Sequence, residues 1–222
     1  MADGKSILIL GASRGIGLGL VEESARRGWQ VVASERSQSD ALHALESVEV
    51  VTADITDPDS YAHLGLADGS LDAALVNAGI SGARHQSADR ATAEEVAEVM
   101  MTNAFGPARA ARALLPKVKN GGTLAFMSSL MGSIADSSGG YELYRTSKVA
   151  QNMLAKGIAE QDARARDVAV LSLHPGWVQT DMGGPNATLT VAQSVSGLAD
   201  VIEGAGGAGY RFVDHTGKTL PF

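Results

Sequence analysis

Short apolar runs alternate with amphipathic stretches along the 222 residues of the chain. The apolar runs predict buried strands, and the stretches between them predict helices. The predicted strands lie at 6–10, 30–34, 48–53, 71–76, 123–127, 168–173 and 210–213. The predicted helices cover about 15–28, 38–46, a short segment from Asp57, 92–115, 142–163 and 190–204. This alternation favours a parallel sheet covered on both faces. We therefore predict a single α/β domain over residues 1–222, a Rossmann-like, doubly wound sheet of about seven strands.

Composition narrows the possible functions. The chain has no cysteine, which excludes disulfides, thiolate metal sites and a cysteine nucleophile. Its 18 basic and 25 acidic side chains give a net charge of −7, which argues against nucleic acid as the main partner. No apolar run approaches the roughly 20 residues of a membrane span, and residues 1–5 show no signal peptide. Because the five histidines are also scattered, we expect a cytoplasmic protein with no membrane partner and no metal.

A glycine-rich corner follows the first predicted strand. A predicted helix begins within it, and its sequence is Gly11-Ala12-Ser13-Arg14-Gly15-Ile16-Gly17. At such a corner, backbone N–H groups of the helix N-terminus point toward a bound anion, and glycine lets the backbone approach it closely. The corner therefore indicates a site for the pyrophosphate of a nucleotide. The alternative is a tight strand-to-helix turn that binds nothing.

Tyr144 and Lys148 stand four positions apart in a predicted helix, so they share one face. The lysine charge favours the phenolate and would lower a phenol pKa of about 10, which suits proton transfer near neutral pH. A pair with this spacing also occurs on solvated helix faces that have no chemistry. Asn103 is a second unusual residue, because asparagine disfavours the interior of a long helix. It marks either a functional position or a local kink.

Taken in order along the chain, these motifs resemble the short-chain dehydrogenase/reductase family of single-domain type. The features that match it are the glycine spacing, Asn77-Ala78-Gly79 after the fourth strand, Asn103, the serines after the fifth strand, the Tyr144–Lys148 pair, and Pro175-Gly176 after the sixth strand. Details at 131–134, 144–148 and 217–222 are most similar to a subgroup that includes the sniffer-type carbonyl reductases and the C-factor-like proteins.

The resemblance implies a catalytic set of Asn103, Ser129, Tyr144 and Lys148. In this set Tyr144 is the general acid in reduction and the base in oxidation, while Lys148 lowers its pKa and holds the nicotinamide ribose. Ser129 hydrogen-bonds the substrate oxygen, and Asn103 supports a proton relay through water. Ser128 and Ser133 compete with Ser129 for its place, because both also follow the fifth strand.

The resemblance also implies which residues bind the cofactor. They are Gly11, Ser13, Arg14, Gly15, Ile16, Gly17, Glu35, Arg36, Asp54, Ile55, Asn77, Ala78, Gly79, Tyr144, Lys148, Pro175, Gly176, Val178 and Thr180. The second strand leads into Glu35-Arg36, where an acid would bind a ribose hydroxyl of NAD and an arginine the extra phosphate of NADP. Arg14 is a second candidate for that phosphate. We therefore expect NADP, with NAD as the alternative.

The expected activity is hydride transfer between a nicotinamide cofactor and a small ketone, aldehyde or secondary alcohol. Because fold does not settle function, a catalytically idle nucleotide-binding module with a signalling role and a 3-ketoacyl-type reductase are the alternatives. The nucleotide fold takes up nearly the whole chain, so loops at the carboxyl ends of the strands must form the substrate site. The resemblance further implies a homodimer or homotetramer that packs helices 92–115 and 142–163 across an interface.

Overall fold

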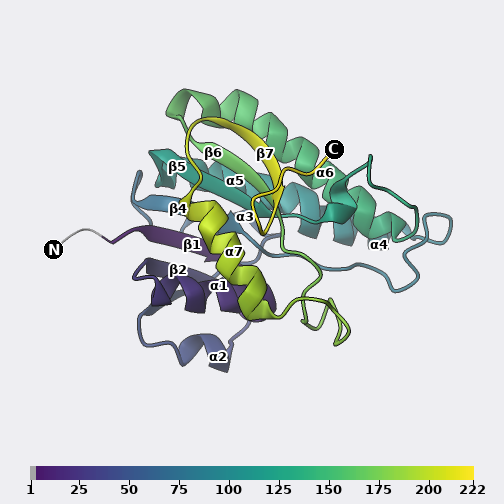
Figure 1. The fold of residues 1–222 in the computed structure, drawn as a ribbon, viewed down its shortest axis with the longest axis horizontal. Helices are drawn as coiled ribbons and strands as arrows, with labels where there is room; N and C mark the ends of the chain where they lie inside the picture. The colour runs from purple at the N-terminus through teal and green to yellow at the C-terminus, as the bar shows by residue number, and fades with distance from the viewer. Residues whose placement is uncertain (1–3) are drawn as a thin grey trace.

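The computed structural model describes residues 4–222. Its seven-stranded sheet is parallel throughout, in the order β3-β2-β1-β4-β5-β6-β7 (Figure 1). The strands are β1 (Ser6–Leu10), β2 (Gln30–Glu35), β3 (Val48–Thr52), β4 (Leu71–Val76), β5 (Val118–Met127), β6 (Ala169–His174) and β7 (Gly209–Asp214). The predicted strands and the Rossmann-like fold are therefore confirmed. Of the N-terminal segment in which no signal peptide was expected, residues 1–3 lie outside the described part.

Helices cover both faces of the sheet (Figure 1). They are α1 (Gly15–Arg26), α2 (Asp40–His43), α3 (Pro58–Ala62), α4 (Ala93–Met100), α5 (Gly106–Leu114), α6 (Glu142–Ile158) and α7 (Val191–Glu203). Successive side chains of a strand point to opposite faces, so Ile7 and Ile9 pack in one core cluster with residues of α1, α2 and α7. Leu8 and Leu10 of the same strand pack in a second cluster with residues of α3, α5 and α6. Each face thus has its own core.

The strand order fixes where a ligand can bind. The chain moves outward from β1 to β2 and β3, and then returns to the other side of β1 with β4. Sheets of this kind bind ligands beyond the carboxyl ends of the strands, at the point where the order reverses. Here the two strand ends carry Gly11 and Asn77, and the N–H of Asn77 donates to the carbonyl of Leu10 at 2.9 Å.

The helix predicted over 92–115 is interrupted in the middle. Between α4 and α5 the chain forms a π-turn, Met101–Phe105, in which the N–H of Gly106 donates to the carbonyl of Met101. Pro107 has no N–H to continue a regular ladder, and Gly106 packs so closely against the carbonyl of Ile55 that no side chain would fit. Asn103, where the sequence allowed a local kink, therefore lies inside this π-helical irregularity.

Other element ends differ from the prediction by a few residues. Thr92 and Glu95 form a capping box at the start of α4, as their spacing is known to favour. The helix expected at 38–46 is reduced to α2, while β5 begins earlier than 123 and pairs with Leu71 of β4. The helix expected at 142–163 is α6 followed by a π-turn, Ala159–Ala163. Within residues 4–222, none of the helices is both long and apolar enough to cross a membrane.

Candidate active site

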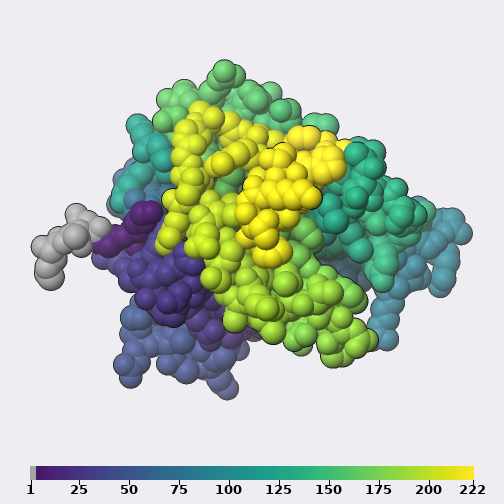
Figure 2. All heavy atoms as spheres, in the orientation of Figure 1, coloured from purple at the N-terminus to yellow at the C-terminus, as the bar shows by residue number. Residues whose placement is uncertain are grey.

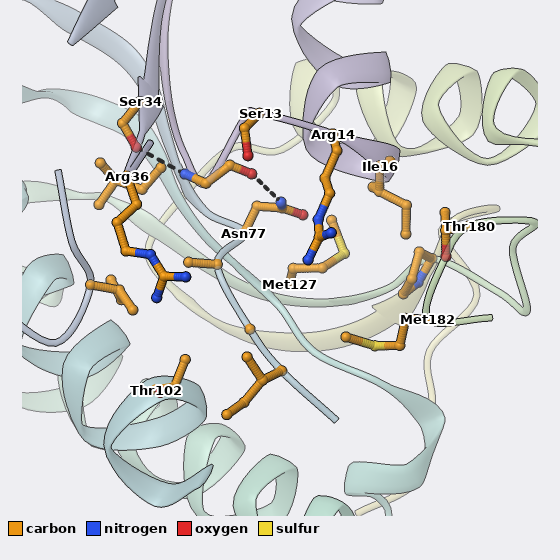
Figure 3. Close-up of a pocket in the computed structure, with 18 of the residues that line it drawn as sticks. Ser13, Arg14, Ile16, Ser34, Arg36, Asn77, Thr102, Met127, Thr180 and Met182 are labelled. Carbon is orange, nitrogen blue, oxygen red and sulfur yellow. Dashed lines mark hydrogen bonds between the residues drawn. The ribbon is translucent and has the colours of Figure 1, made fainter. Parts of the chain in front are cut away.

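A cleft of about 440 Å³ lies beyond the carboxyl ends of the central strands. Figure 3 shows Ser13 and Arg14 of the glycine corner, Arg36 beyond β2, and Thr180 and Met182 beyond β6 around one space. The residues that line it are Leu10, Gly11, Ser13, Arg14, Gly15, Ile16, Ser34, Arg36, Ala53, Asp54, Ile55, Tyr61, Asn77, Ala78, Gly79, Ile80, Thr102, Met127, Ser128, Tyr144, Lys148, Pro175, Thr180, Asp181 and Met182. The cleft therefore joins the predicted nucleotide site to Tyr144 and Lys148. In the space-filling view, the chain beyond β6 projects as a green lobe below the yellow C-terminal segment (Figure 2).

The glycine corner is held in shape by the ends of β2 and β4. Gly11 has a φ of 86°, a left-handed conformation that favours glycine. Its N–H donates to Ser34 Oγ at 2.9 Å, and its carbonyl accepts from Asn77 Nδ2 at 2.6 Å (Figure 3). A Cβ at Gly11 would lie 2.8 Å from the backbone nitrogen of Ala78. The corner therefore packs closely against the end of β4, and the N-terminus of α1 lies on the cleft wall.

Tyr144 and Lys148 lie one helical turn apart on α6. Lys148 Nζ lies 5.7 Å from the centroid of the Tyr144 ring, and it donates to the carbonyl of Met127 at 2.8 Å and to Gln151 Oε1 at 3.2 Å. Burial raises the pKa of Tyr144 to about 12, with a hydrogen bond to Ser129 acting in the opposite direction. Burial also lowers the pKa of Lys148 to about 7. The shift at Tyr144 is opposite to the predicted one, because desolvation disfavours both the phenolate and the ammonium that would stabilise it.

Asn103 is fully buried behind the cleft rather than on its wall. Its Oδ1 accepts from the N–H of Ile80 at 2.8 Å, and its Nδ2 donates to the carbonyl of Ile80 at 2.8 Å and to Ser147 Oγ at 3.0 Å. Ser147 Oγ in turn donates to the carbonyl of Tyr144 at 2.7 Å. Asn103 thus connects the end of β4 to the turn of α6 that carries Tyr144.

The three serines after β5 have different surroundings. Ser128 is buried, and its Oγ donates to Asn152 Oδ1 at 2.7 Å. Ser133 is also buried, and its Oγ accepts from the N–H of Asp136 at 3.1 Å. Ser129 is half-buried, its Oγ accepts from the N–H of Met131 at 3.1 Å, and its side chain is the one that acts on the pKa of the Tyr144 phenol, although Ser128 rather than Ser129 lines the cleft. The serine favoured by the sequence pattern is therefore the one beside the phenol.

Glu35 and Arg36 lie on opposite sides of the cleft wall. Glu35 is 6% exposed and set back from the cleft, where its carboxylate accepts from the N–H of Ser39 at 2.7 Å and contacts His43 Nε2 at 2.8 Å. The hydrogen bonds from His43 and Ser39 hold the pKa of Glu35 below its ordinary value in spite of burial. Arg36 is exposed and lines the cleft near Asp54. Only the arginine of this pair faces the space where a ribose would lie.

The loop after β6 contributes both wall and support. Pro175 and Thr180 line the cleft. Gly176 has a φ of 83°, and a Cβ there would collide with the side chain of Leu189. Val178 is buried and forms a β-bridge with Leu189. Gly176 and Val178 thus shape the loop without lining the cleft.

Most of the predicted cofactor-binding residues line the cleft, and Gly17, Glu35, Gly176 and Val178 are set back from it. Gly17 packs behind the glycine corner, where a Cβ would lie 2.7 Å from Asn77 Nδ2. The sequence did not single out the lining residues Leu10, Ser34, Ala53, Tyr61, Ile80, Thr102 and Met127. Most of them lie next to a predicted motif in the sequence, and this position could have identified them as lining residues. Tyr61, on the short helix α3, had no such signal.

A doubly wound sheet with a glycine corner and a Tyr–Lys pair in one cleft defines the class of Rossmann-fold oxidoreductases. Residues 5–188 match the family model described as short chain dehydrogenase. The chain therefore belongs to the short-chain dehydrogenase family, which confirms the resemblance that the motifs indicate.

Individual relatives agree with this assignment. The chain is 40% identical over 158 residues to C-signal from Myxococcus xanthus, covering 69% of this chain and 94% of that protein. Its structure is similar to that of a carbonyl reductase from Pseudomonas aeruginosa PAO1 in complex with NADP, with 41% identity, a TM-score of 0.90, and coverage of 99% of this chain and 100% of that one. Carbonyl reductase Sniffer of D. melanogaster is 30% identical, with a TM-score of 0.89 and the same coverage.

Proposed function

We propose that the chain is an NADP-dependent oxidoreductase that reduces a small ketone or aldehyde, or oxidises a secondary alcohol in the reverse direction. Tyr144 is its general acid and base. The observation that carries this proposal is the cleft, whose wall runs from the glycine corner to Tyr144 and Lys148. The similarity to the carbonyl reductase in complex with NADP supports it over nearly the whole chain.

The cleft fits a nicotinamide dinucleotide. The 12-residue helix α1 presents its N-terminus at the glycine corner, where N–H groups and the helix dipole favour a pyrophosphate. Asp54 and Ile55 line one part of the cleft and would hold the adenosine, while Pro175 and Thr180 line another and would hold the nicotinamide. When bound, the cofactor supplies or accepts the hydride, which no side chain of the chain can do.

Two arginines and the orientation of Glu35 support NADP over NAD. Glu35 is held away from the cleft by Ser39 and His43, so its charge does not face an incoming phosphate. Arg36 and Arg14 both line the cleft. Arg14 Nη1 lies 3.3 Å from Asp181 Oδ2, but an ion pair between two largely exposed side chains is weak, so Arg14 is free to exchange this partner for a phosphate.

Each catalytic residue has a role that its contacts allow. Tyr144 donates its phenol proton to the carbonyl oxygen in reduction and takes a proton from the alcohol in oxidation. Ser129, beside the phenol, hydrogen-bonds the same substrate oxygen. Lys148 is fixed by the Met127 carbonyl, orients the ribose and returns a proton to Tyr144. Asn103 supports the turn that carries Tyr144.

Replacing Tyr144 with phenylalanine tests the proposal. A panel of ketones and aldehydes is screened with NADPH, and a panel of alcohols with NADP, both read by nicotinamide absorbance. Tyr144→Phe keeps the ring and removes the proton donor, so we expect kcat to fall by about 100-fold or more and the Kd for NADPH to stay within about threefold. A wild-type chain that binds NADPH without turning over any substrate, or a variant with wild-type turnover, would contradict the proposal.

We also propose that the chain forms a homo-oligomer through the faces of α4 and α6. Three large apolar side chains are exposed there: Val96 to 41%, Phe105 of the adjoining π-turn to 44%, and Met153 to 71%. Large apolar side chains that stay exposed on elements packed against each other would be covered if a second copy bound there. Light scattering of the purified chain tests this proposal, and a monomer at micromolar concentration would contradict it.

A further inference from the structure

The helix that carries Tyr144 and Lys148 begins without a cap of its own. Tyr141, at its N-cap position, has a left-handed conformation with φ 50° and ψ 39°, and its side chain makes no capping hydrogen bond. The first four N–H groups of an α-helix have no partner within the helix. Tyr144 is the third residue of α6, so its N–H is one of these groups. Another part of the chain must therefore fix the start of this helix.

Gln86, in the loop after β4, supplies the missing cap. Its Oε1 accepts from the N–H of Tyr144 at 3.1 Å, and its backbone carbonyl accepts from the N–H of Glu142 at 2.9 Å. In the other direction, the Glu142 carboxylate accepts from the N–H of Ala88 at 2.6 Å. Since 58 positions separate Gln86 from Tyr144, this cap is a tertiary contact rather than a local turn.

Gln86 is itself held in one orientation. Its Nε2 donates to the carbonyl of Ser81 at 2.7 Å and to the carbonyl of Ala83 at 2.6 Å, so both ends of the amide are used. Its φ of 56° is left-handed. A residue other than glycine rarely adopts this conformation, and it persists only where the surroundings hold it. The loop is therefore built around the position of this one side chain.

The carbonyl of Tyr144 is held from the opposite direction, through Ser147 and Asn103. The N–H and the carbonyl of the same residue thus each have a side-chain partner. We propose that Gln86 is a positioning residue for Tyr144, because it fixes the start of α6 and so places the phenol against Ser129 and Lys148. This inference rests on the proposed function of Tyr144 as the proton donor.

Gln86→Leu tests the inference, since leucine fills similar space without a hydrogen bond. We expect kcat to fall by about 10- to 100-fold, as a small displacement of a catalytic group can do, while the KM for NADPH changes by less than about threefold. The limb of the kcat–pH profile that reports on Tyr144 should also shift. Gln86→Glu keeps an oxygen that can accept from Tyr144, so its kcat should lie well above that of Gln86→Leu.

Gln193→Leu is the matched control. Gln193 belongs to the capping box of α7, where its Oε1 accepts from the N–H of Thr190 at 2.9 Å. The variant therefore removes a glutamine cap from a helix that carries none of the predicted catalytic residues. We expect its Tm to fall about as much as that of Gln86→Leu, with kcat unchanged.

Hydrogen exchange of the Tyr144 amide provides a measurement that does not depend on turnover. It should become at least about tenfold faster in Gln86→Leu and stay unchanged in Gln193→Leu. The inference is overturned if this exchange is not accelerated, or if both variants keep wild-type kcat while Tyr144→Phe is inactive. In the second case the proposed function stands and only the role of Gln86 fails. A wild type without turnover refutes the proposed function, and the positioning role falls with it.

Discussion

Asn103 makes three hydrogen bonds in the interior behind the cleft, two with the backbone of Ile80 and one with Ser147. Its side chain is 0% exposed. Asn103→Ala removes all three bonds and leaves the N–H and the carbonyl of Ile80 without their side-chain partner. Because Ser147 also holds the carbonyl of Tyr144, we expect the variant to lose both stability and turnover.

The size of the stability loss follows from these bonds. A typical hydrogen bond within a protein contributes about 0.5–1.5 kcal/mol to the free energy of unfolding, so losing three lowers it by roughly 2–4 kcal/mol. In a chain of this size, 1 kcal/mol corresponds to a Tm change of about 2–4 °C. We therefore expect the Tm of Asn103→Ala to lie roughly 5–15 °C below that of the wild type.

Thermal and urea unfolding measure the effect, without cofactor and at one protein concentration, since ligands and assembly both shift apparent stability. Asn120→Ala is the matched control, because Asn120 is exposed and its Oδ1 accepts a single hydrogen bond from Arg166 Nε at 3.1 Å. Its free energy of unfolding should change by less than about 0.5 kcal/mol. The reasoning is refuted if Asn103→Ala is no less stable than Asn120→Ala. Lost turnover at wild-type stability would then place Asn103 in the chemistry itself.

Two further predictions concern the cofactor and acid stability. Arg36→Ala should raise the KM for NADPH by about tenfold or more, because it removes a charged hydrogen bond to the extra phosphate. The KM for NADH should stay unchanged. An equal rise in the KM for both cofactors would contradict this prediction. For His174, burial lowers the pKa to about 4 from 6.5, against the opposing charge of Asp214. As the pH falls, His174 therefore takes up a proton in the unfolded chain before it does so in the folded one. Its contribution to the free energy of unfolding is fully present above about pH 6.5 and is lost toward pH 4, by at most about 3 kcal/mol. His174→Asn should lose less stability between pH 7 and pH 5 in urea unfolding, and an identical pH dependence would count against the reasoning.

The sheet could be predicted because its signals are local. Each central strand is buried on both faces, so it stands out as a short apolar run. The start of α4 could also be predicted, because the side chains of Thr92 and Glu95 each accept from the other residue's backbone N–H within one turn. The glycine corner could be assigned for the same reason, because its left-handed residues lie next to a strand and a helix whose patterns are clear.

The parts of the site that the sequence left open depend on tertiary contacts. Gln86 caps a helix that begins far along the chain, and no local pattern encodes that contact. Ser34 is similar, since its hydroxyl matters only because the parallel pairing of β1 and β2 brings it to the N–H of Gly11. Tyr61 reaches the cleft through the packing of α3, which the sequence shows only as a short helix.

Glu35 and Arg36 are neighbours in the sequence, and the expected cofactor depends on which of the two faces the cleft. Neighbouring residues at the end of a strand point to opposite sides, so one of the two must face the cleft and the other must turn away. The sequence contains both an acid and an arginine there, so it favours NADP but leaves NAD as the alternative. The decision comes from Ser39 and His43, which bind the Glu35 carboxylate on the far side. The proposed preference for NADP therefore depends partly on Ser39 and His43, which do not line the cleft.

Burial of Tyr144 and Lys148 bears on the direction of proton transfer in the proposed reaction. With a pKa of about 12, Tyr144 is a neutral phenol at neutral pH, the form that would donate a proton to the oxygen of a carbonyl undergoing reduction in the proposed reaction. Oxidation requires the phenolate, and each unit by which the pKa is raised disfavours that form by about 1.4 kcal/mol. A protonated Lys148, with Nζ 5.7 Å from the ring centroid, opposes this effect, but the same burial lowers its own pKa to about 7. In the proposed reaction, a protonated Lys148 would therefore make it easier for Tyr144 to act as a base, and a neutral Lys148 would not.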